Sequence, residues 1–169
     1  MMTDEFLTFL AYSTELEQES QERYLEIAES MEAHRNDEVA RFFHRMSDEA
    51  GSHLAEVSLL CEGAELPQIK AWEFNWPGAE PPETTSYEAL HYRMSLHDAM
   101  TLALANERAA EQFYRDYALN SKDAEVISTA KDFADEENSH AQALELMLEE
   151  VPVVSELARE EDDPPTMPE

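Results

Sequence analysis

Apolar residues recur at steps of three and four along four stretches of the chain, the spacing of one face of an α-helix. These stretches cover about residues 4–31, 37–60, 96–119 and 122–150. Thr3 and Ser121 are predicted N-caps of the first and last stretch, and Ser95 and Asp98 have the spacing of a capping box before the third. Each stretch would form a helix about 37 Å long, at 1.5 Å per residue. The pattern predicts an all-α fold with four long helices.

The connection between the second and third helices, about residues 63–94, differs from the rest of the chain. It contains four prolines and three aromatic residues: Pro67, Pro77, Pro81, Pro82, Trp72, Phe74 and Trp76. Short connections join antiparallel neighbours, whereas this one is long enough to run the length of a bundle. We expect its aromatic side chains to fix it against the helices, with a partner surface as the alternative. Residues 87–94 could add a short helix.

The domain organisation follows from these elements. Residues 1–154 are expected to form one four-helix domain, large enough to bury a core. Residues 155–169 are rich in Glu, Asp and Pro, and they are expected to be a disordered tail.

Each apolar stripe contains ionisable residues near its middle: Glu17, His53 and Glu107 in the first three helices, and Glu137 with His140 in the fourth. These side chains therefore point inward, toward one another. Burying a carboxylate without a partner costs several kcal/mol, and three in one core repel each other unless they are protonated or bridged by cations. The pattern predicts a metal site. Carboxylates and imidazoles without a thiolate suit iron, manganese or zinc.

The two halves of the chain also repeat. The string DEENSH, residues 135–140, holds a Glu-x-x-His pair, and DEAGSH, residues 48–53, repeats it with Ala50 in place of the glutamate. A glutamate also precedes a tyrosine by seven residues in both halves, at Glu17 and Glu107. The repeat predicts two similar helical hairpins joined by the long crossover, which is the ferritin-like plan.

None of these features is decisive alone, because a single buried histidine is usually a core residue and Glu-x-x-His is common in helices. Their coincidence on four helices favours the metal site. The two repeated tyrosines, Tyr24 and Tyr114, are candidates for hydrogen-bond donors to ligands or for one-electron relays. The alternative is that both are core tyrosines.

The composition of the chain excludes several kinds of partner and site. The chain has 39 acidic and 11 basic residues, a formal charge of −28, which disfavours nucleic acids and anionic membrane surfaces as partners. Solvated helix faces explain most of this acidity. A single cysteine, Cys61, rules out an internal disulfide and a four-cysteine metal site. The start of the chain does not resemble a secretory leader and no apolar run approaches a membrane span, so a cytoplasmic location is expected.

The chain resembles the rubrerythrin-like branch of the ferritin-like superfamily over about residues 5–151. The matching strings are ELEQESQERYLEIAE, RMSDEAGSH, ALANERAAEQFYRDYA and FADEENSH. The resemblance implies a diiron carboxylate bundle that reacts with oxygen or hydrogen peroxide. It assigns as metal ligands the residues Glu17, His53, Glu107, Glu137 and His140.

The chain departs from the family pattern at two places. Ala50 stands where a carboxylate would bridge the two metals, leaving a gap that water, Glu49 or Glu111 could fill. Rubrerythrins proper also carry an iron site of two Cys-x-x-Cys pairs, and Cys61 alone cannot supply it. An enzyme of this kind would need a separate electron donor protein. A homodimer is expected from the same resemblance.

Three functions follow as hypotheses. The leading one is a non-haem diiron oxidoreductase that acts on peroxide, oxygen or ferrous iron, with two bound irons, or manganese or zinc instead. The second is a metal-binding or metal-handling module without catalysis, which Ala50 favours because the second metal position is weakened. The third is a structural bundle with a vestigial site.

Overall fold

The computed structural model describes residues 1–69 and 92–153. Four α-helices make up nearly all of this part: α1 (Asp4–Ala33), α2 (Asp37–Leu60), α3 (Leu96–Asn120) and α4 (Ala124–Glu150). The described residues contain no strand. The all-α, four-helix prediction is confirmed, and the predicted helix ends lie within two residues of the observed ones.

Polar side chains begin three of the helices. The Thr3 hydroxyl accepts a hydrogen bond from the Phe6 backbone N–H at 3.1 Å. Before α3, Ser95 and Asp98 exchange side-chain-to-backbone hydrogen bonds of 3.0 and 3.2 Å, which is the expected capping box. The predicted cap of α4 was wrong: Asp123, not Ser121, accepts hydrogen bonds from two backbone N–H groups of the first turn. A carboxylate suits this place because the N-terminal end of a helix is partially positive.

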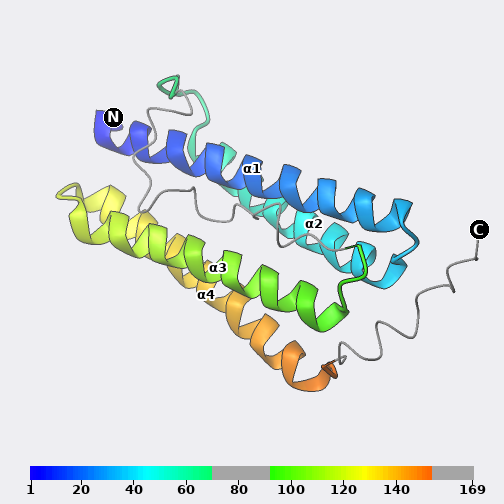
Figure 1. The fold of residues 1–169 in the computed structure, drawn as a ribbon. Helices are drawn as coiled ribbons and strands as arrows, with labels where there is room; N and C mark the ends of the chain where they lie inside the picture. The colour runs from blue at the N-terminus through cyan, green and yellow to red at the C-terminus, as the bar shows by residue number, and fades with distance from the viewer. Residues whose placement is uncertain (70–91, 154–169) are drawn as a thin grey trace, which may run out of the picture.

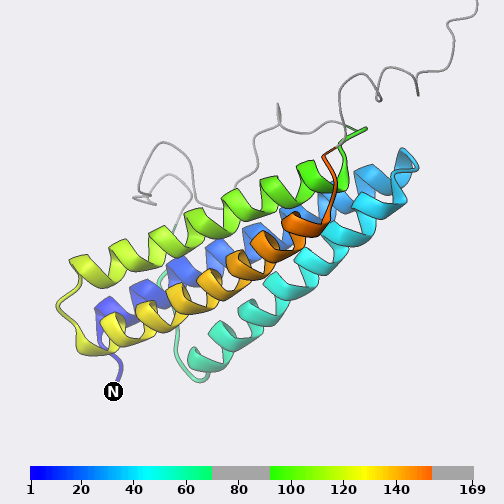
Figure 2. The same ribbon diagram turned by 90° about the horizontal axis from the view of Figure 1, so that it is seen from below.

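The helices pack as two antiparallel hairpins, α1 with α2 and α3 with α4, laid side by side with their axes running nearly along one direction (Figures 1 and 2). Contacts of α2 with α3 and of α1 with α4 join the hairpins. At one end of the bundle, hydrogen bonds link Thr3 to Asp123 and Ser121 to Glu5. The structure therefore has the predicted arrangement of a four-helix bundle made of two hairpins.

The other end of the bundle is fixed by the turn between α1 and α2. The Asn36 side-chain amide donates hydrogen bonds to the backbone carbonyls of Tyr92 and Met94, at 3.2 and 3.0 Å. The His34 ring stacks on Tyr92, with ring centroids 3.7 Å apart and nearly parallel planes. These contacts place the start of α3 beside the end of α1.

The described ends of the crossover lie at opposite ends of the bundle. Cys61, just after α2, packs against the apolar cluster that includes Phe6, whereas Met94, just before α3, belongs to the cluster that includes Met31 and Leu144. The connection thus joins opposite ends, as its length predicted. Residues 92–95 form a turn and extended backbone rather than the end of a helix. The three crossover aromatics, most of the short helix expected at 87–94 and the tail at 155–169 lie outside the described residues.

The core consists of two apolar clusters with a polar layer between them. One cluster occupies the end with the N-terminus of α1 and includes Phe9, Val57, Ala110 and Phe133. The other occupies the opposite end and includes Met31, Phe43, Met100 and Leu144. On every helix the residue of the polar layer falls between the members of these clusters: Glu17, His53, Glu107 and Glu137, all buried. The fold therefore places ionisable groups at the centre of the bundle, where apolar packing excludes water from both sides.

None of the four helices has an apolar stretch long enough to cross a bilayer, within the part of the chain that the structure describes.

Candidate metal centre

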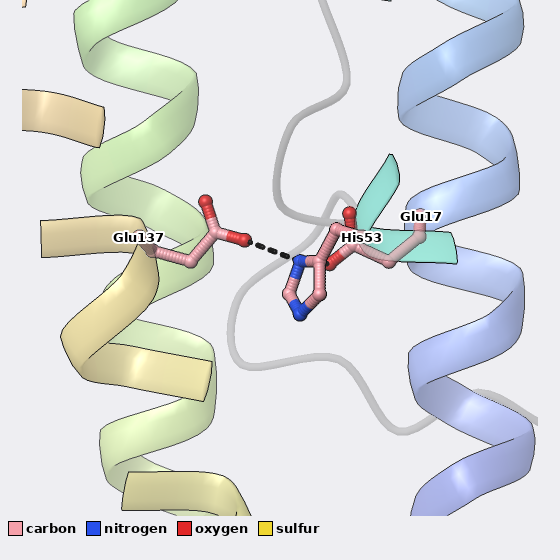
Figure 3. A group of neighbouring side chains, drawn as sticks. All are labelled: Glu17, His53 and Glu137. Atoms are coloured by element: carbon pink, nitrogen blue, oxygen red, sulfur yellow. Dashed lines mark hydrogen bonds and ion pairs between the residues drawn. The ribbon is translucent and has the colours of Figure 1, made fainter. Parts of the chain in front are cut away.

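Three helices bring Glu17, His53 and Glu137 together (Figure 3). The His53 Nδ1 atom lies 2.9 Å from Glu17 Oε1 and 3.1 Å from Glu137 Oε1. All three side chains are buried. The imidazole from α2 therefore stands between a carboxylate of the first hairpin and one of the second. Its Nδ1 atom and the two oxygens form one group of atoms that could hold a cation.

A second group of Glu107, Glu137 and His140 lies on the α3–α4 hairpin. The His140 Nδ1 atom is 3.7 Å from both Glu107 Oε2 and Glu137 Oε2. In each group the candidate ligand atoms lie within 4.8 Å of one another. Glu137 belongs to both groups, through Oε1 toward His53 and Oε2 toward His140. One carboxylate is thus placed to join two neighbouring cation positions.

A cavity of about 10 Å³ lies among these side chains. Its lining consists of the five predicted ligands with three neighbours: Glu17, Ser20, Glu49, Ala50, His53, Glu107, Glu137 and His140. The methyl group of Ala50 thus faces the space beside the ligands, as expected for the missing carboxylate. The space suffices for about one water molecule.

Protons balance the charges of this metal-free arrangement. Burial would lower the pKa of His53, but the carboxylates of Glu137 and Glu17 raise it to about 11. Contacts with Glu107 and Glu137 raise the pKa of His140 to about 10. Burial, together with the neighbouring carboxylate of Glu107, raises the pKa of Glu137 to about 8.

Glu107 responds in the opposite direction. Burial would raise its pKa, but contacts with the Glu137 carboxyl and with His140 outweigh burial and lower it. The two neighbouring glutamates thus differ, one holding a proton at neutral pH and the other remaining charged. Such a separation of pKa values is typical of functional sites, and of a pair of carboxyl groups that share one proton.

One ligand atom of the site has no partner in the metal-free arrangement. Glu137 Oε2 is buried without a hydrogen-bond partner, although buried polar groups are normally paired. Glu137 Oε2 is one of the oxygens that face the second group. Carboxylate oxygens and imidazole nitrogens without thiolate suit iron, manganese or zinc. The residues present therefore fit the pair of metal ions that the sequence predicts.

A third Glu/His group, which sequence reasoning missed, lies behind His53 and consists of His53, Glu56 and Glu136. The His53 Nε2 atom is 3.4 Å from Glu136 Oε2. Carboxylates placed on the outer nitrogen of a ligand imidazole fix the ring so that the other nitrogen faces the metal. The signal was present in the sequence, since Glu56 follows His53 by one helical turn and Glu136 directly precedes Glu137.

The structure separates the two repeated tyrosines. The Tyr114 hydroxyl donates a hydrogen bond of 2.9 Å to Glu17 Oε1, so this tyrosine contacts a candidate ligand. Tyr24 is buried in the apolar cluster at the other end of the bundle, where its ring stacks on Phe43. A role of Tyr24 at the metals stays a prediction.

Glu111, a further candidate for replacing the missing carboxylate, is engaged elsewhere. Its oxygens lie 2.8 Å from Arg108 and 3.0 Å from Arg115. These ion pairs place Glu111 among the charged residues of the helix face.

Replacing Tyr114 with phenylalanine is expected to weaken the protein, because Glu17 loses a buried hydrogen bond. The expected loss in the free energy of unfolding is about 1–3 kcal/mol, measured by urea denaturation of the metal-free protein. Tyr117→Phe, one turn further along α3, is the matched control, and its loss should be smaller. Equal losses in both variants would contradict the importance of the Tyr114–Glu17 bond.

Two antiparallel helical hairpins that gather carboxylates and imidazoles at their centre define a ferritin-like bundle with a candidate metal centre. The Rubrerythrin family model matches residues 8–148, and the chain belongs to this family. A solved structure of an uncharacterised conserved protein from Magnetospirillum magnetotacticum MS-1 is 36% identical. The similarity covers 88% of this chain and 97% of that one, with a TM-score of 0.68. No similar protein was found among the curated proteins compared with the chain.

Proposed function

We propose that this protein is a non-haem diiron oxidoreductase that reduces hydrogen peroxide. Oxygen is the alternative oxidant, and ferrous iron is the metal that either oxidant would oxidise. The observation that carries the proposal is the position of Glu137, which belongs to two Glu/His groups at once. Glu17 and His53 would hold one iron, Glu107 and His140 the other, and Glu137 would contact both. Membership of the rubrerythrin family supports a diiron carboxylate protein.

Two ferrous ions at this site would supply the two electrons needed to split the O–O bond of a peroxide. The side chains contribute charge balance and protons. The carboxylates would balance most of the charge of two divalent cations. Tyr114 holds Glu17 in place through its hydroxyl. The apolar clusters on either side exclude water and strengthen these interactions.

The proposed electron donor is a separate protein. With one cysteine in the whole sequence, the chain cannot form the iron site of two Cys-x-x-Cys pairs found in rubrerythrins proper. The net charge of −28 favours a donor with a basic docking face.

Stopped-flow mixing of the ferrous protein with hydrogen peroxide tests the proposal. The protein is loaded with Fe²⁺ without oxygen, freed of excess metal and analysed for iron, with about two ions per chain expected. Mixing with one equivalent of peroxide per iron pair should oxidise both irons rapidly, read from the near-ultraviolet absorbance of the ferric product. If peroxide oxidises the iron-loaded protein no faster than it oxidises free Fe²⁺, the proposed enzymatic function is wrong.

Metal binding without catalysis is the second candidate, and the small cavity beside Ala50 favours it. A bridging carboxylate at this position would couple the two metals, and without one the second position is weaker. About one metal ion per chain, or zinc alone in the protein as purified, would support this function. A chain that takes up no metal at all would instead be a structural bundle with a vestigial site.

A further inference from the structure

Glu49 lies at the boundary between the candidate metal centre and the protein surface. It lines the cavity of about 10 Å³ among the ligands, together with Glu107, Glu137 and His140. It also lines a second cavity, a surface hollow of about 130 Å³ between α2 and α4. The walls of this hollow are mostly apolar and consist of Phe42, Arg45, Met46, Glu49, His140, Ala143, Leu144 and Met147. Glu49 and His140 are the two residues common to both spaces.

The charges around Glu49 agree with this position. Glu49 is an exposed residue, yet partial burial of its carboxyl group raises its pKa. The neighbouring charge of His140 lowers this pKa and that of Glu107 raises it. Because the charges of two candidate ligands shift its pKa, the Glu49 carboxyl group lies close to the candidate metal centre. Arg45, one turn earlier on α2, acts on the same carboxyl from the side of the hollow.

The two cation positions are not equally complete. The Glu17–His53–Glu137 group is fully buried, and Tyr114 hydrogen-bonds to its Glu17. The second group has Glu107, Glu137 and His140, and the His140 side chain is 27% exposed, on the side of the hollow. Ala50 lines the space that lies among the ligands of both groups. Glu137 Oε2, which faces the second group, is buried without a hydrogen-bond partner. The second position therefore has room for a further carboxylate and can be reached from the hollow.

We propose that Glu49 takes the role of the carboxylate missing at Ala50. Its side chain completes the second metal position, beside Glu107, Glu137 and His140, and it receives a divalent cation that enters through the hollow between α2 and α4. The adjacent residue on a helix is rotated by about 100°, so Glu49 approaches from the flank of the ligand stripe rather than from within it. In the structure its carboxylate is in neither group of candidate ligand atoms, so its long side chain would turn toward the cavity that it lines when the metal binds. This inference rests on the two-metal site of the proposed function.

Titration with Mn²⁺ tests the role of Glu49 without any redox reaction. The full chain, freed of metal, is titrated calorimetrically, and free Mn²⁺ is followed by electron paramagnetic resonance. The unaltered protein should bind two equivalents. In Glu49→Gln the first equivalent should bind as before and the second about tenfold more weakly or worse, since even outer partners of metal ligands contribute 10–100-fold.

Asp48→Asn is the matched control, because it removes the same charge from the neighbouring exposed position. The comparison is made in about 0.5 M salt, where charges at the surface are screened within a few ångströms. Under these conditions Asp48→Asn should bind both equivalents normally. Equal weakening in the two variants would show that Glu49 acts only through the surface field and would overturn its assignment as a ligand.

A double variant provides a second test, which measures restored rather than lost metal binding. Adding Ala50→Glu to Glu49→Gln restores a carboxylate at the repeat position, and the second equivalent should again bind tightly. Two equivalents bound equally well with and without Glu49 would overturn the role of Glu49 alone. Binding of fewer than two Mn²⁺ by the unaltered chain would contradict the two-metal site itself, and with it the proposed function.

Discussion

Replacing Glu137 with glutamine is expected to abolish tight binding at both metal positions. Glu137 contributes one oxygen toward His53 and the other toward His140, so a single change removes a charged ligand from both groups. An amide is a weak metal ligand and carries no charge, so affinity at each position should fall by a factor of 100 or more, on the order of 3 kcal/mol. Equilibrium dialysis against Mn²⁺ or Fe²⁺, followed by elemental analysis, measures the change.

The fold of this variant should survive, which separates lost ligation from lost structure. Burial raises the pKa of the Glu137 carboxyl to about 8, so at pH 7 the metal-free protein already holds this side chain mainly in its neutral form. Glutamine has the same shape and is also neutral. The melting temperature of the metal-free variant should therefore stay within a few degrees of the unaltered protein.

Two control variants should lose metal binding at one position or at neither, in contrast to Glu137→Gln. Glu17→Gln should weaken the position at His53 and spare the one at His140, because Glu17 belongs to the first group alone. Glu111→Gln should leave both positions intact, because Glu111 is paired with Arg108 and Arg115. Retention of two tightly bound ions by Glu137→Gln would contradict the shared carboxylate.

The helices could be predicted from the sequence because each has a long apolar stripe, and the hairpin arrangement because the two halves repeat. The exact ends of the helices were harder to predict where two neighbouring residues could both act as the N-cap. Ser121 and Asp123 are both good capping residues, and which of them begins α4 depends on the path of the turn. In the structure Ser121 ends α3 and its hydroxyl accepts a hydrogen bond from the Asp123 backbone. A stripe pattern cannot fix a boundary to that precision.

The five candidate ligands could be predicted because each interrupts an apolar stripe at the same level of the bundle. What surrounds them depends on the relative rotation and height of helices, which periodicity does not give. Glu49 and Glu136 lie one position off the stripes, so the pattern could name Glu49 only as one of several groups that might fill the gap at Ala50, and it did not single out Glu136. In the structure Glu49 lines the central cavity and Glu136 lies 3.4 Å from the outer nitrogen of His53.

The two repeated tyrosines lie on opposite sides of the polar layer. The repeat makes Tyr24 and Tyr114 equivalent in sequence, but the two hairpins run through the bundle in opposite directions. The two side chains consequently belong to apolar clusters at opposite ends of the core. Each tyrosine thus lies seven residues beyond a candidate ligand of its own helix, on opposite sides of the polar layer.

Metal binding by this protein is expected to release protons and to strengthen as the pH rises. The pKa values of His53, His140 and Glu137 are raised to about 11, 10 and 8, so all three groups hold a proton at pH 7 in the metal-free state. A metal ion needs a neutral imidazole and a charged carboxylate, so it must displace these protons. About three protons should be released when both positions fill. Calorimetric titration in two buffers that differ in ionisation enthalpy counts them, and affinity should rise steadily from pH 6 to 8.

The same groups set the stability of the metal-free protein, and the sign follows from their shifts. A pKa raised on folding gives stability that is fully present below the unfolded value and is lost as the pH rises through the folded one. For Glu137 that loss extends from about pH 4.5 to 8, and for the two histidines it extends from about pH 6.5 to between 10 and 11. The melting temperature without metal should therefore fall by about 5 °C or more between pH 6 and 10. With metal bound these protons have already been released, so the melting temperature should fall much less over the same pH range. Equal decreases in the metal-free and metal-bound protein would mean that the metals do not bind to the buried carboxylates and imidazoles.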